Sequence, residues 1–225
     1  MNITTKNKHI YLTPKSGKYT HVIIFLHGFG DGPKSYVDFF EHEVLPKNIS
    51  ARIILLQAPM LPTSMAGGMP MASWFDITKF PIDSEKCFSF PEAQNSSKIL
   101  ENIINEEAKL LNGKYENIFI GGFSQGACVS LYTGYTFNHL LGGVLCCSGC
   151  LFPQTKILPQ NKDLKVFVGH GTSDNVIPFE THKLSLMPLG NTSNITRCYY
   201  PNMQHTIEQK EVNDIKQFLQ KYMKN

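Results

Sequence analysis

Short, continuously apolar runs alternate along this chain with longer stretches of helical period. Five of the runs are rich in β-branched residues, and a sixth is weaker. They are Val22–Leu26, Arg52–Leu56, Asn117–Ile120, Gly143–Cys146, Leu164–Val168 and, as the weaker one, Thr196–Tyr200. Apolar residues at consecutive positions are typical of strands that are buried on both faces of a sheet.

Helical periods separate these runs. Glu92–Asn112 carries apolar residues at i, i+3 and i+4 spacing and is followed by Gly113, and Val212–Tyr222 repeats the pattern at the end of the chain. Ser35–Leu45, Gln125–Phe137 and a shorter segment after Pro178 are also expected to be helical. Strands that alternate with helices predict an α/β fold, with a mostly parallel central sheet covered by helices on both faces.

The stretch 57–90 shows neither the continuous apolar runs of buried strands nor the spacing of a helix, and several prolines interrupt it. A loop of this length within a compact domain is typical of a lid or a binding loop. We therefore expect residues 1–225 to form one domain in which 57–90 is the lid. In a parallel sheet the reactive side chains gather where loops leave the carboxyl ends of the strands.

The composition of the chain excludes several classes of function. The 225 residues are 42% hydrophobic and carry a formal net charge of +3, and their lysines are scattered rather than clustered, which argues against nucleic-acid binding. No run of eighteen apolar residues and no secretory pattern is present. The six cysteines lie mostly in apolar runs, as expected of reduced thiols in the cytoplasm.

The strand at Asn117–Ile120 runs into Gly122-Phe-Ser-Gln-Gly126, and a helix follows at once. This is the G-x-S-x-G pattern in the strand–turn–helix context of an α/β-hydrolase nucleophile. Only glycine fits on either side of the serine in so tight a turn. The pattern predicts that Ser124 is a catalytic nucleophile.

A serine nucleophile needs a histidine base and a carboxylate that orients it, and in this fold they follow in the order Ser, Asp, His. Asp174 follows one strand and His205 follows the last one, so both are expected at the rim that carries Ser124. His170 competes, but it precedes Asp174, which reverses the order. The remaining histidines considered, which we expect at the surface or at helix ends, are His21, His42, His139 and His182.

Two backbone N–H groups should stabilise the oxyanion of an acyl-transfer reaction. Gln125 follows the nucleophile and should supply the first, and the glycine-rich loop after the first buried strand should supply the second. Within that loop, His27–Gly32, we favour the N–H of Phe29. A phosphate cradle is the alternative reading, but the loop lacks the Walker lysine.

In combination these motifs resemble the acyl-protein thioesterase and carboxylesterase/lysophospholipase family. The shared segments run in order from about residue 20 to the C-terminus. They are Phe25–Asp31, Gln57–Pro59, Ser73–Ile77, Gly121–Gly126, Leu131-Tyr132, His170-Gly171 with Asp174 and Val176–Pro178, and His205.

The resemblance implies an acyl-protein thioesterase that removes S-palmitoyl groups through an acyl-enzyme on Ser124, without a metal or organic cofactor. It implies that acylated proteins or lysolipid esters are the substrates, that membrane contact is at most transient, and that any homodimer is weak. An acyl channel is implied beneath the methionine-rich loop, where Met65, Met69, Met71 and Trp74 would bind substrate. A short-chain carboxylesterase or lysophospholipase and, third, a non-catalytic lipid-binding relative remain the alternatives.

Overall fold

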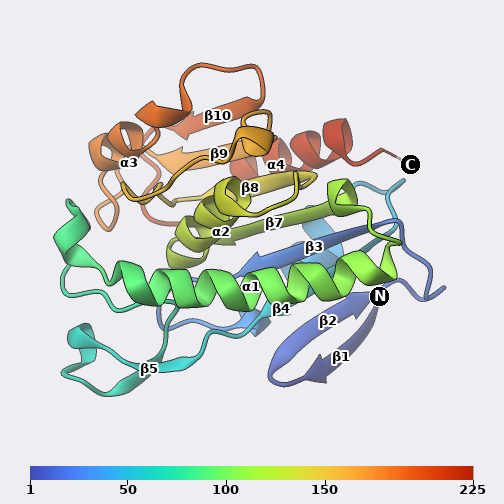
Figure 1. Ribbon diagram of the computed structural model, residues 1–225, viewed down its shortest axis with the longest axis horizontal. Coiled ribbons are helices and arrows are strands. Elements are labelled where there is room, and N and C mark those ends of the chain that lie inside the picture. Colours follow the sequence, from blue (N-terminus) through green and yellow to red (C-terminus); the bar gives the residue numbers. More distant parts are fainter. Residues whose placement is uncertain (225) are drawn as a thin grey trace.

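A twisted sheet of eight strands forms the centre of the molecule in the computed structural model, which describes residues 1–224 (Figure 1). The strand order is β1-β2-β4-β3-β7-β8-β9-β10. The first two strands are antiparallel and the remaining six run parallel to one another. The strands are β1 (Asn2–Lys6), β2 (His9–Thr13), β3 (His21–Leu26), β4 (Ala51–Leu56), β7 (Ile118–Phe123), β8 (Gly143–Cys147), β9 (Val166–Gly171) and β10 (Ile195–Tyr200).

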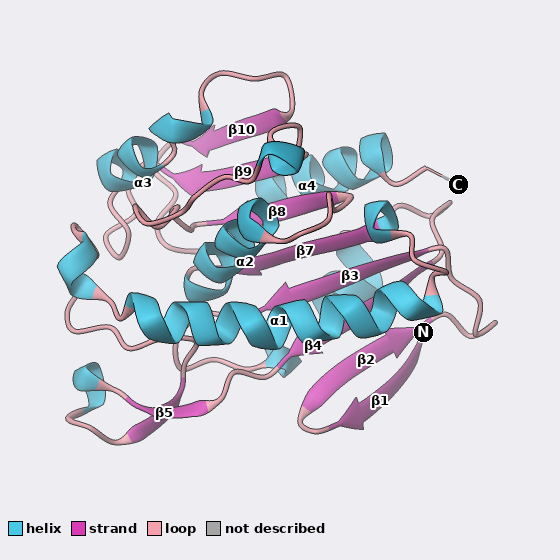
Figure 2. Cartoon of the chain, in the orientation of Figure 1, coloured by secondary structure: helices cyan, strands magenta, loops and turns pink. Residues whose placement is uncertain are grey.

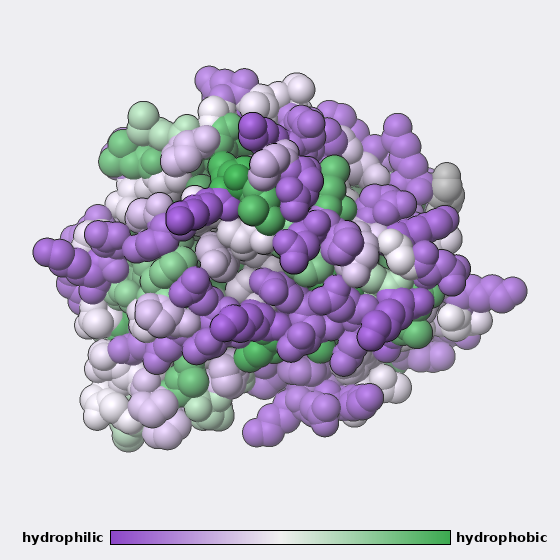
Figure 3. Space-filling model, viewed as in Figure 1, coloured by the Kyte–Doolittle hydropathy of each residue, from purple (hydrophilic) through white to green (hydrophobic). Residues whose placement is uncertain are grey.

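Helices cover both faces of the sheet, as Figure 2 shows. On one face lie α1 (Phe90–Leu110), α2 (Gln125–Thr136) and α3 (Phe179–Ser185). On the other lie α4 (Gln209–Tyr222), a 3₁₀ turn at Pro33–Tyr36 and a π-helical turn at Phe39–Glu43. Each face has its own apolar core, and hydrophilic side chains run along the outward face of α1 (Figure 3). The predicted fold class is confirmed.

All six predicted strands are present, but the N-terminal hairpin of β1 and β2 was not predicted. Its turn places Asn7 and Lys8 in the left-handed region without a glycine, and every residue of β1 is exposed, so only the short alternation of β2, in which Ile10 and Leu12 are buried, marks it. Ser35–Leu45 is also not a continuous α-helix. The stretch 57–90 holds a small hairpin of β5 (Met60–Pro62) and β6 (Pro70–Ala72).

Candidate active site

The carboxyl ends of the parallel strands bring three distant side chains to one rim. Ser124 follows β7, Asp174 lies in the turn after β9, and His205 lies in the loop between β10 and α4. The three residues therefore follow β7, β9 and β10, which lie in this same order across the sheet.

Ser124 occupies a strained turn. Its φ is +55° and its ψ is −116°, a conformation that a residue other than glycine seldom adopts. A Cβ atom on Gly122 would lie 2.3 Å from the carbonyl carbon of Gly126, and one on Gly126 would lie 2.2 Å from the backbone oxygen of Leu26. The two glycines thus let the strand and the helix meet closely at the turn that carries Ser124.

A chain of hydrogen bonds joins the three side chains. The Nδ1 of His205 lies 2.7 Å from Oδ2 of Asp174, and its Nε2 lies 2.8 Å from the hydroxyl oxygen of Ser124. A carboxylate can only accept, so Nδ1 carries the proton and Nε2 is free to accept the serine proton. The geometry is that of a serine nucleophile beside an oriented base.

Asp174 is held as a carboxylate. Its side chain is fully buried, which by itself raises the pKa of the carboxyl. The hydrogen bond and charge of His205 and the N–H groups of Val176 and Ile177, each 2.9 Å from Oδ1, outweigh burial and lower the pKa overall. The orienting group is therefore ionised at neutral pH.

Two backbone N–H groups near Ser124 in the chain or in space are unpaired among the described residues. Among the described residues, no protein group accepts a hydrogen bond from the N–H of Phe29 or from that of Gln125. The loop that carries Phe29 passes close to the serine, since a Cβ atom on Gly28 would lie 3.5 Å from Cβ of Ser124. Both predicted donors are thus available to an oxyanion.

The side chain of Gln125 was not given a role from the sequence. Its Oε1 accepts from the N–H of Trp74 at 3.1 Å, and its Nε2 donates to the carbonyl of Phe75 at 2.6 Å. The residue after the nucleophile thereby ties the stretch 73–75 to the start of α2.

His27 is a second residue whose role the sequence did not reveal. It is buried, its Nε2 accepts from the N–H of Ala58 at 3.0 Å, and its Nδ1 lies 2.7 Å from the carbonyl oxygen of Gly28. Burial lowers the pKa of this imidazole, so it is neutral. His27 fixes the loop that presents the Phe29 N–H. Its position two residues before Phe29 is the only signal in the sequence.

The four residues expected to bind the acyl chain are dispersed. Met65 and Met69 are 42% and 66% exposed on the β5–β6 hairpin, and Met71 packs its methyl group against Gly30. The expectation that Trp74 contacts the acyl chain is wrong. It has no exposed surface and donates its indole N–H to the carbonyl of His27, so it supports the loop rather than facing a ligand.

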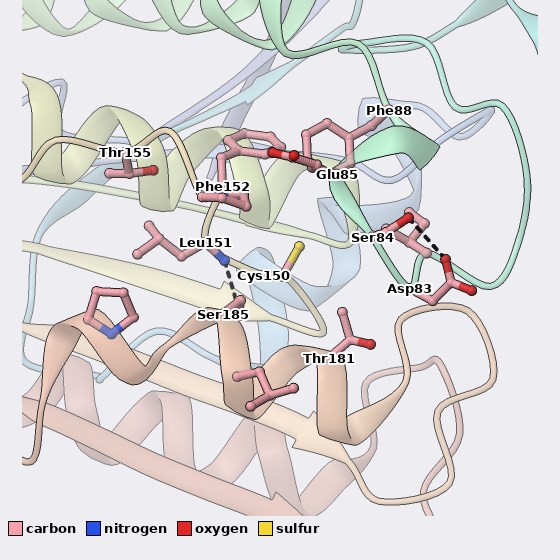
Figure 4. Close-up of a pocket in the computed structure, with 14 residues that line it drawn as sticks. Asp83, Ser84, Glu85, Phe88, Cys150, Leu151, Phe152, Thr155, Thr181 and Ser185 are labelled. Atoms are coloured by element: carbon pink, nitrogen blue, oxygen red, sulfur yellow. Dashed lines mark hydrogen bonds between the residues drawn. The ribbon is translucent and has the colours of Figure 1, made fainter.

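An apolar cavity of about 400 Å³ lies elsewhere, between α3, the loop 82–88 and the segment after β8 (Figure 4). None of those four residues lines it. Its apolar walls are Ile82, Phe88, Cys150, Leu151, Phe152, Leu184 and Pro188.

None of Ser124, Asp174 and His205 lines this cavity, but segments next to two of them contact its walls. The thiol sulfur of Cys150 lies 3.6 Å from that of Cys128, which is on the first turn of α2 behind Ser124. On another wall, the N–H of Ile82 donates to the carbonyl of Val176, two residues from Asp174.

Within residues 1–224, no three His, Cys, Asp or Glu side chains come together as a metal site would require. In that same range no helix has the length and apolar character needed to traverse a bilayer.

Known proteins share this sequence and this fold. The family model described as phospholipase/carboxylesterase matches residues 7–223. Acyl-protein thioesterase 1 of Mycosarcoma maydis is 32% identical, covering 95% of this chain and 96% of its own length. The homologous protein of Yarrowia lipolytica, named acyl-protein thioesterase 1, is also 32% identical, covering 94% and 96%.

Among solved structures, Arabidopsis thaliana SOBER1 superposes with a TM-score of 0.79 at 26% identity, covering 91% of this chain and 99% of that one. Zea mays acyl-protein thioesterase 2 has the same fold, with a TM-score of 0.79 at 23% identity over 97% of this chain and 100% of that one. The chain therefore belongs to the phospholipase/carboxylesterase family of α/β-hydrolases, and it is a hydrolase.

Proposed function

We propose that this hydrolase removes long-chain acyl groups from protein thioesters, with Ser124, His205 and Asp174 as its catalytic triad. The observation that carries the chemistry is the pair of contacts at His205, 2.7 Å to the carboxylate and 2.8 Å to the hydroxyl. The names of the relatives at 32% identity support an acylated protein as substrate.

The reaction starts when His205 takes the Ser124 proton as the hydroxyl oxygen attacks the acyl carbonyl. Asp174 keeps Nδ1 protonated and stabilises the imidazolium that forms. The N–H groups of Gln125 and Phe29 receive the oxyanion, and each such donor is worth about 2.7–4 kcal/mol in other hydrolases.

Collapse of the intermediate breaks the carbon–sulfur bond, and the thiol leaves with the proton from His205. Water, deprotonated by the same histidine, then hydrolyses the acyl-enzyme and frees Ser124. This chemistry calls for no metal or organic cofactor.

The cavity beside Cys150 supports a long acyl chain as the group transferred. Its volume of about 400 Å³ lies in the range of pockets that enclose an apolar ligand of moderate size, and its walls are mainly apolar. A short-chain carboxylesterase would share the triad but would not need such a cavity.

The six free cysteines, five of them buried, support the cytoplasm as the compartment, because reduced thiols persist there.

The test has two parts. Ser124→Ala should lower kcat by about 10⁶, as removal of the nucleophile does in serine proteases, and a fluorophosphonate probe should label Ser124 alone. Turnover of palmitoyl-thioester peptides should then exceed that of acetyl esters. A serine variant with normal activity would exclude the triad, whereas preference for acetyl esters would favour the carboxylesterase.

A further inference from the structure

Asp174 contacts two histidines rather than one. The oxygen that accepts from His205 also lies 3.3 Å from Nε2 of His170, and the side chains of His170 and Asp174 are both fully buried. His170 is the histidine that the chain order set aside as a base. The structure places it near the carboxyl end of strand β9, with no exposed surface that could contact substrate.

The tautomer of His170 follows from its partners. Its Nε2 lies 2.9 Å from the carbonyl oxygen of Ile177, which can only accept, so Nε2 carries a proton. Its Nδ1 has no partner among the described residues. Burial lowers the pKa of His170, so the ring is a neutral donor at physiological pH.

The N–H of His170 also stabilises the turn whose backbone binds Asp174. The N–H of Ile177 donates to Oδ1 of Asp174, while the carbonyl of the same residue accepts from His170. The imidazole therefore restrains the carboxylate through the turn, while its Nε2 also lies 3.3 Å from Oδ2.

A second imidazole fixes the plane of the first. His182 of α3 stacks on His170 with 3.9 Å between ring centroids, and its Nδ1 lies 2.6 Å from the carbonyl of Gly149. His182 lies in the last turn of α3, one of the two positions expected for it, but it is fully buried rather than at a surface. Burial and the neighbouring His170 lower its pKa to about 3, so it stays neutral.

The groups that face this stack are few. Asp174 and His205 face His170, and Asp174 and Arg197 of β10 face His182. Histidine is the residue type whose charge ordinarily changes between pH 5 and 8, so the acid limb of a pH profile reports on the interaction of His205 with Asp174.

Building on the proposed function, we propose that His170 is a positioning residue that orients Asp174 and moderates the pull of this carboxylate on His205. The Nε2–H group of His170 carries partial positive charge 3.3 Å from Oδ2, and this charge offsets part of the attraction between the carboxylate and an imidazolium at 205. Loss of the His170 N–H should therefore make protonated His205 more stable, and the enzyme should lose activity at a higher pH on the acid side.

The principal variant is His170→Phe, which retains a ring for stacking and removes the N–H. With a short p-nitrophenyl ester, we expect kcat to fall about tenfold, and the acid limb of kcat/KM to move upward by roughly half a pH unit, as loss of a polar N–H near the carboxylate and of the bond that holds its turn implies. His182→Phe is the matched control, since it alters the same stack without removing an N–H from the side of Asp174, and its acid limb should not move.

A second pair of variants keeps the test decisive if the phenylalanine variant does not fold. Glutamine at 170 can place an amide N–H near the position of Nε2, whereas asparagine is too short, so His170→Gln should retain the wild-type limb and His170→Asn should not. An unmoved limb in His170→Phe, or an equal shift in His182→Phe, would overturn the proposal. Failure of the triad itself would show separately, as a Ser124→Ala variant that remains active.

Discussion

Glu211 offers the sharpest test of the energetics of this fold. It lies in the first turn of α4 and has no exposed surface, and its carboxyl group is packed against β9, where a Cβ atom on Gly169 would lie 2.1 Å from Oε1. Neither carboxyl oxygen has a hydrogen-bond partner of good geometry among the described residues, and the Cys147 thiol beside it is a weak one. Burial, with smaller effects from Asp214 and Glu208, raises the pKa of Glu211 to about 8.

The raised pKa determines how stability changes with pH. Below the pKa of the unfolded chain, 4.5, both states hold the proton and the group has no effect. Between 4.5 and about 8 only the folded state holds it, so the free energy of unfolding falls by about 1.4 kcal/mol per pH unit. By pH 7 the loss amounts to about 3 kcal/mol, a large share of the 5–15 kcal/mol typical of a domain.

Urea unfolding of the wild type and of Glu211→Gln, measured from pH 5 to pH 9, isolates this effect. Glutamine has nearly the same shape and does not ionise, so its own packing cost is the same at every pH. The variant should gain about 3 kcal/mol relative to the wild type between pH 5 and pH 7, and the gain should level off above pH 8. A difference that stays constant within 0.5 kcal/mol, roughly the error of linear extrapolation, would show that Glu211 does not hold its proton in the folded state.

Two further predictions concern the cavity and the nucleophile turn. Leu184 lines the cavity and is 63% exposed, so Leu184→Trp should fold normally. The variant should reduce turnover of palmitoyl thioesters about tenfold and leave turnover of acetyl esters unchanged. Equal losses for both chain lengths would place the acyl chain elsewhere. Gly126→Ala would put a methyl group 2.2 Å from the Leu26 oxygen, so it should lower the free energy of unfolding by about 3 kcal/mol and abolish labelling of Ser124 by a fluorophosphonate. A stable, labelled variant would contradict the steric account of the turn.

Features that depend on a few neighbouring residues were predictable from the sequence. Apolar runs in the sequence predict the buried strands. The turn at Ser124 requires glycine at 122 and 126, because a Cβ atom at either position would collide with the backbone. Asp174 and His205 could be chosen because parallel strands deliver their carboxyl-end loops to one rim. Order along the chain and position after a strand therefore carried the choice of these two residues.

Other features depend on which distant segments come into contact, and the sequence does not record those distances. The cavity is enclosed by α3, the loop 82–88 and the segment after β8, three parts of the chain that meet only in the folded molecule. Trp74 was expected to bind substrate and His182 to lie at a surface or a helix end, yet both side chains are buried, and so is Glu211.

Local sterics and hydrophobic period thus determined the sheet and the position of the nucleophile. Tertiary packing decided which polar groups lost their water, and with that the second histidine on Asp174, the proton on Glu211 and the space left open for a ligand. The physical reason is that steric conflicts act between neighbours in the chain, whereas desolvation and cavity volume depend on every segment that packs around a site.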